Sequence, residues 1–61
     1  MTEFIDQIRE RVDEALTNLD RARSEGDDYA AQVHTGELES FARLADEHGV
    51  RIPRLADFRA A

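Results

Sequence analysis

Apolar residues in the first part of the chain recur at steps of three and four, the spacing of a helix that buries one face. Phe4 and Leu16 lie beside this line of residues and widen it. No glycine or proline interrupts the pattern before Gly26, so we expect a helix over about residues 3–24. The line itself consists of Ile5, Ile8, Val12, Ala15, Leu19 and Ala22.

Residues 25–28 read as the end of one helix and the start of another. Gly26 can adopt the left-handed conformation that ends helices, and Asp27 or Asp28 can cap the helix that follows. Because short connections join antiparallel neighbours, we expect a helical hairpin in preference to one unbroken rod. Tyr29, beside the turn, is expected to pack against the end of this hairpin.

A second helix is predicted over about residues 29–48, again with one apolar face. Thr35 and Gly36 interrupt its middle: they are either a tolerated weak point, a close helix crossing, or a break with Thr35 capping a new segment. We expect the helix to continue through residues 35–36. Its inner face consists of Ala30, Val33, His34, Leu38, Phe41, Leu44, Ala45 and His48.

Residues 49–61 form a C-terminal arm of different composition. Gly49 can end the preceding helix, and Pro53 can open a short one. Ile52, Leu55 and Phe58 recur every three residues. The arm either folds back over the hairpin or reaches a partner. We expect it to fold back, because so short a chain can hardly leave three large apolar residues exposed.

Length and charge extend this picture to assembly. A single domain of 61 residues hides only about 60% of its unfolded surface, so a partner surface is the natural remedy. The arm has three arginines and one aspartate, whereas the net charge of the whole chain is −6. The predicted fold is all-α: an antiparallel two-helix hairpin with a short helical arm, in a dimeric four-helix bundle or docked on a larger protein.

Composition also limits the compartment. The chain has no cysteine, no apolar run of membrane-spanning length and no basic-then-apolar start typical of a signal peptide. We therefore expect a cytoplasmic protein that does not enter membranes. All eight basic residues are arginine, which suggests a GC-rich bacterial genome.

Catalytic signatures are missing from the sequence. It has no G-x-S-x-G, no glycine-rich phosphate loop and no H-E-x-x-H, and its carboxylates fall at solvent-facing helical positions. We expect no enzyme activity and no cofactor.

Both histidines lie on the apolar face of the second predicted helix. His34 and Glu37 form an H-x-x-E pair, and His48 lies two heptads after His34. The first helix offers no further ligands on its inner face. A helical bundle with a His/Glu metal site is therefore a third interpretation, behind a structural role for these side chains.

A second interpretation comes from residues 41–58. Leu44-Ala45, then Gly49-Val50 at a turn, then Leu55 and Phe58 resemble the helix-turn-helix motif of bacterial regulators. The resemblance implies DNA binding, in which Arg51, Arg54 and Arg59 would contact phosphates. Nucleic acid is nevertheless an unfavoured partner, since the net charge of −6 adds long-range repulsion.

The interpretation that the sequence favours is a non-enzymatic interaction protein: a small subunit, adaptor or regulator that binds its own copy, a larger protein, or both. Its interface residues are predicted to be Ile5, Ile8, Val12, Leu16, Leu19, Val33, Leu38, Phe41, Leu44, Ile52, Leu55 and Phe58.

Overall fold

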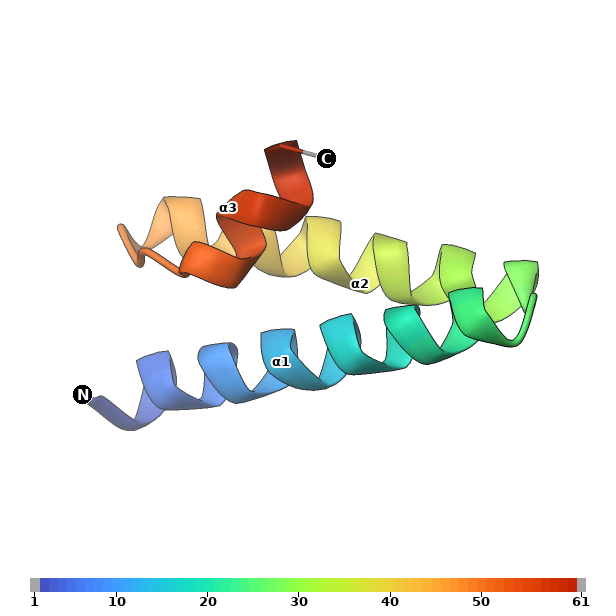
Figure 1. Cartoon of the computed structure of the whole chain (residues 1–61). Coiled ribbons are helices and arrows are strands. Elements are labelled where there is room, and N and C mark those ends of the chain that lie inside the picture. The colour runs from blue at the N-terminus through green and yellow to red at the C-terminus, as the bar shows by residue number, and fades with distance from the viewer. Residues whose placement is uncertain (1, 61) are drawn as a thin grey trace.

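A computed structural model describes residues 2–60, and over that range it contains three helices and no strand. They are α1 (Thr2–Ser24), α2 (Asp28–Glu47) and α3 (Pro53–Ala60). In Figure 1, α1 and α2 run antiparallel, with the N-terminus of α1 near the C-terminal end of α2. The all-α class and the helical hairpin are thus confirmed.

The turn between α1 and α2 combines a glycine stop with an aspartate cap. Gly26 has φ 69°, and the N–H groups of Gly26 and Asp27 donate to the carbonyls of Arg23 (3.2 Å) and Ala22 (2.8 Å). This pairing is the Schellman motif. Asp27 Oδ1 then accepts from the Ala30 N–H at 3.0 Å and caps α2. The turn thus satisfies carbonyl groups at the end of α1 and an N–H group at the start of α2, which would otherwise lack partners within their helices.

α2 continues without a break through Thr35 and Gly36. The Thr35 hydroxyl donates to the Ala31 carbonyl at 2.8 Å, one turn back in the same helix, so it does not cap a new segment. Among the described residues, no heavy atom outside the helix backbone lies within 4 Å of a Cβ added at Gly36. The prediction of a continuous helix is confirmed, and Gly36 marks no close crossing.

The core lies between the hairpin helices and extends to α3. Val12 and Leu38 are fully buried, at 0% exposure each, at the centre of the α1–α2 contact. Polar residues occupy the outward-facing positions of both helices, as expected for a pair of amphipathic helices. The buried cluster consists of Ile8, Val12, Ala15, Leu19, Leu38, Ala42, Ala45, Ile52 and Leu55.

The C-terminal arm folds back onto the hairpin, as the sequence predicts. Gly49 has φ 66°, and the Val50 N–H donates to the Ala45 carbonyl at 2.8 Å in a second Schellman motif. This turn directs α3 back beside the C-terminal half of α2 (Figure 1). Ile52 and Leu55 are buried there.

Three residues differ from the predicted inner face or packing of the second helix. Tyr29 is 79% exposed and Val33 is 43% exposed, and His48, the C-cap of α2, is exposed as well. α2 meets α1 along the line through Leu38, and Tyr29 lies nine residues before it, which is two and a half turns and thus the opposite side. Val33 lies five residues before Leu38 and is also well off that line. The helical period was right, but the face is narrower than predicted.

Candidate contact surface

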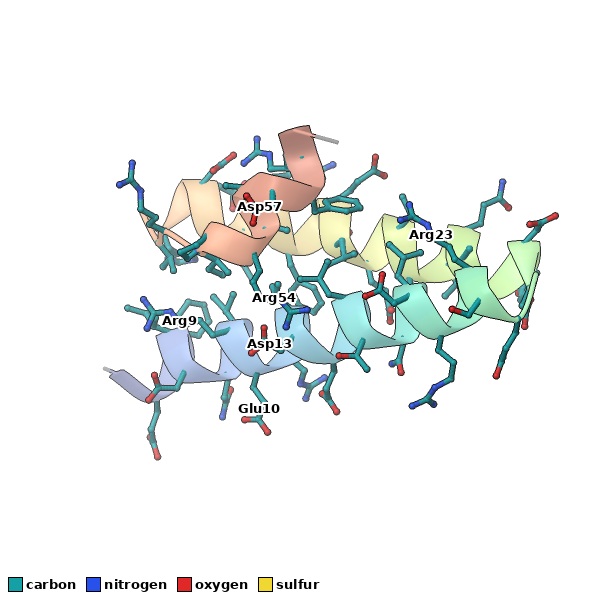
Figure 2. All side chains as sticks on the ribbon, in the orientation of Figure 1. Arg9, Glu10, Asp13, Arg23, Arg54 and Asp57 are labelled. Carbon is teal, nitrogen blue, oxygen red and sulfur yellow. The ribbon has the colours of Figure 1, made fainter. Side chains whose placement is uncertain are left out.

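α3 lies on one long side of the hairpin, here called the α3 side, beside the C-terminal half of α2 (Figure 1), and contacts both hairpin helices. Arg54 Nη1 lies 2.9 Å from Asp13 Oδ1 on α1, and Figure 2 shows Arg54 pointing from α3 toward that carboxylate. Arg59 binds Asp46 on α2 through both guanidinium nitrogens, at 3.1 and 3.2 Å. All four side chains are about half exposed, so these ion pairs orient α3 more than they stabilise it.

The other long side of the hairpin carries a strip of apolar and aromatic side chains, which we call the open strip. Val33, Phe41 and Leu44 lie on one side of α2, with Glu37 between Val33 and Phe41, and His48, the C-cap of α2, follows Leu44 by one turn. Phe41 and Leu44 are half-buried, and His48 is exposed. The open strip consists of Phe4, Val33, Phe41, Leu44 and His48.

Phe4 joins the open strip from the start of α1. Its ring meets the His48 imidazole edge to face, with centroids 5.0 Å apart and an interplanar angle of 68°. It is nevertheless 44% exposed, because it lies at the open end of the hairpin. The apolar pattern placed Phe4 on the widened core face of the first predicted helix, and Phe4 was not among the predicted interface residues. Its position near the start of that helix was the feature of the sequence that could have indicated its exposure.

Helix geometry places the open strip away from α3. Ala42 and Asp46 on α2 line a hollow together with Phe58 and Arg59 of α3. Leu44 lies two residues from both Ala42 and Asp46, which is slightly more than half a turn. The Leu44 side chain therefore projects from α2 on the side that α3 leaves uncovered.

A shallow groove separates α1 from α3 on the α3 side. Its rim has two acids and two arginines, among them Arg23 and Asp57, which are labelled in Figure 2. Because the two signs balance, the groove has no strong preference for cations or anions. The groove is lined by Leu16, Leu19, Asp20, Arg23, Arg54, Asp57 and Phe58.

The predicted interface residues separate into three groups by burial. One group is buried inside the chain and packs in its own core: Ile8, Val12, Leu19, Leu38, Ile52 and Leu55. A second group is half-buried at the margins of the core: Ile5, Leu16, Phe41, Leu44 and Phe58. Val33 alone of the predicted set is exposed. The structure therefore leaves Val33, Phe41 and Leu44 on the open strip, together with Phe4 and His48.

The candidate metal ligands do not converge. His34 Nδ1 and Glu37 Oε1 are joined by a 2.7 Å hydrogen bond within α2, whereas His48 lies against Phe4 at the open end of the hairpin. Over residues 2–60, no group of three or more His, Cys, Asp or Glu side chains is placed to hold a metal ion.

The arginines of the arm are positioned mainly by the fold. Arg54 and Arg59 bind carboxylates on α1 and α2, and Arg51 is exposed. Five residues, 48–52, separate α2 from α3, compared with the three or four of a typical helix-turn-helix turn. DNA binding stays a hypothesis, and phosphate contacts would require Arg54 and Arg59 to leave their present partners.

Comparisons with known proteins identify no relative of this chain. No family model matches the chain, and neither a curated protein nor a solved structure gives a significant match. Within residues 2–60, none of the helices combines the length and apolar character needed to cross a bilayer.

Proposed function

We propose that this chain is a non-enzymatic interaction protein, a small subunit, adaptor or regulator that acts through protein–protein contacts. The open strip carries the proposal. Phe4 and Val33 are almost half exposed, and Phe41 and Leu44 lie between them, with Glu37 separating Val33 from Phe41. Exposed apolar side chains gathered on one face of a small protein are typical of protein interaction sites.

Surface area supports the proposal independently of any one residue. The chain exposes 4626 Å² of accessible surface. The usual scaling for compact monomers gives about 4,000 Å² at its mass of 6.9 kDa. About 600 Å² is thus in excess of what a compact monomer of this mass exposes. An excess of this size is consistent with a surface that another protein covers.

The distribution of polar groups favours contact over catalysis. General acid–base catalysis requires carboxylates held in a water-poor cleft. Each carboxylate side chain that the structure describes is exposed instead, and these acids follow the outer faces of the helices. Their role in this proposal is to keep the helices solvated around the apolar strip.

The occupant of the open strip is either a second copy, giving a dimeric four-helix bundle, or a larger protein. Either occupant hides the same side chains. A test of the contact role should therefore be independent of the occupant's identity.

Size-exclusion chromatography of a cell extract provides this test, with the tagged chain expressed at its natural level in the organism that encodes it. We expect the chain to elute well above the size of a free 6.9 kDa species. Val33→Glu places a charge on the open strip and should return the chain to the free size. Gln32→Glu is the matched control: it adds the same residue at the adjacent, exposed position, off the strip, and should leave the elution unchanged. A wild-type chain that elutes as the free species would contradict the proposal.

A further inference from the structure

We infer that the occupant of the open strip is a second copy of this chain, packed about a two-fold axis with α3 on the outside. This inference rests on the proposed function and names its partner. α1 and α2 of both copies would then form a four-helix bundle whose centre is the pair of open strips.

Area is the first argument for a second copy. Each chain exposes about 600 Å² beyond the expectation for its mass, and a two-fold contact removes equal area from both copies. Two chains together would hide about 1,200 Å², which lies at the lower end of the range for specific protein interfaces. The excess is therefore about the amount that a small, reversible dimer requires.

The length of the open strip is the second argument. His48, the C-cap of α2, follows Val33 by fifteen residues, which corresponds to about 22 Å of helix. The molecule is 38 Å long and only 15 Å across its shortest axis. A second hairpin matches the strip along its whole length, and side-by-side helices pack by fitting their ridges into grooves.

Charge at the strip, beside it on α1 and within it on α2, is the third argument. Arg11 lies two turns after Phe4 on the same side of α1, whereas Glu37 lies between Val33 and Phe41 on α2. A two-fold axis parallel to the helices lays α1 of one copy over α2 of the other. Since the Phe4–His48 contact sets the register, Arg11 is then level with Phe41, one turn from Glu37. The surface is in this respect self-complementary.

Net charge opposes dimer formation and predicts how the association constant depends on salt. Each copy carries −6, so two copies repel each other over long range. At physiological ionic strength this repulsion is screened beyond about 8 Å, while the apolar contact is retained. Added salt should thus tighten a dimer of this acidic chain, whereas it would weaken binding of a basic partner.

Sedimentation equilibrium of the purified full chain tests the inference directly, at micromolar to submillimolar protein. We expect a monomer–dimer equilibrium whose association constant rises several-fold between about 0.05 M and about 0.5 M sodium chloride. Val33→Glu should lower the association constant by at least tenfold per copy, hence about a hundredfold, because each substitution enters the dimer twice. Gln32→Glu should follow the wild type within a few-fold.

Other outcomes are equally informative. A folded wild-type chain that stays monomeric over this range overturns the inference, and so does an equal effect of the two substitutions. If the purified chain is monomeric while Val33→Glu still disrupts the species in cell extract, the second copy is wrong and the contact function stands. If both experiments fail, the open strip is no contact surface.

Discussion

The two long sides of the hairpin both carry large apolar side chains, but these side chains differ in how far they are buried. On the α3 side, Ile52 and Leu55 fill the gap along α1 and α2 and become buried. On the other side, Phe41 and Leu44 remain half-buried and Val33 is exposed. α3 has eight residues and therefore covers about 12 Å of that side. The comparison shows that the chain covers part of one side with its own C-terminal arm, whereas Phe4 and Val33 on the other side stay exposed.

Burial, not ion pairing, accounts for the difference between the sides. Complete burial of a large apolar side chain contributes about 1.5–3 kcal/mol, whereas an exposed ion pair contributes about 0–1 kcal/mol. Arg54 and Arg59 therefore add little beside Ile52 and Leu55, and their role is to fix the orientation of α3.

Removing the arm should have the largest effect, since it uncovers the α3 side as well. Deletion of residues 51–61 removes the burial of Ile52 and Leu55, a loss of about 3–6 kcal/mol, which is a large fraction of the stability of a small domain. Thermal unfolding followed by far-ultraviolet circular dichroism should show a much lower or non-cooperative transition. An unchanged melting curve would mean that α3 is not part of the core.

A pair of alanine substitutions compares the sides at single positions. Leu55→Ala, on the α3 side, should reduce the free energy of unfolding by about 2–5 kcal/mol. Phe4→Ala, on the open strip, should cost about 1 kcal/mol or less in dilute monomer, because almost half of that side chain already contacts water. Urea titration at low protein concentration measures both. Equal losses would contradict the distinction between the two sides.

Gly36→Ala should stabilise α2 without changing either side. Glycine costs about 1 kcal/mol relative to alanine inside a helix, and a methyl group at this position meets no neighbour among the described residues. We expect a gain of about 1 kcal/mol in urea titration with no change in self-association. A loss of stability would indicate that α2 bends or breaks at this position.

The smallest effect concerns the ion pairs of the α3 side. Arg54→Gln should cost no more than about 1 kcal/mol, and the loss should diminish in high salt. Arg51→Gln removes the same charge from the arm at an exposed position and is the matched control. A loss of several kcal/mol at Arg54 alone would mean that ion pairing, and not burial, holds α3.

Much of the fold could be predicted from periodicity and stop signals. Ile8, Val12 and Leu19 recur at steps that only a helix brings to one side, and Gly26 and Gly49 end helices where the sequence places them. These features are local, because they depend on residues a few positions apart. The helix bounds and the returning arm follow from the same signals.

The division between the two sides could not be read from the sequence in the same way. Leu38 and Phe41 both belong to the apolar face of α2, yet only Leu38 is fully buried. Which of them faces α1 depends on the rotation of α2 and on the side that α3 takes, and both are long-range properties. The ion pair of Arg54 with Asp13, forty-one residues away, is set by the same packing.

Hydroxyl-radical footprinting as a function of protein concentration tests the central difference between the two sides most directly. Leucine and aromatic side chains report on both sides within one sample. We predict that Phe4, Phe41 and Leu44 become protected as the concentration rises, while Leu55 and Phe58 keep the same protection throughout. Protection that changes equally on both sides, or first at Leu55 and Phe58, would contradict the account.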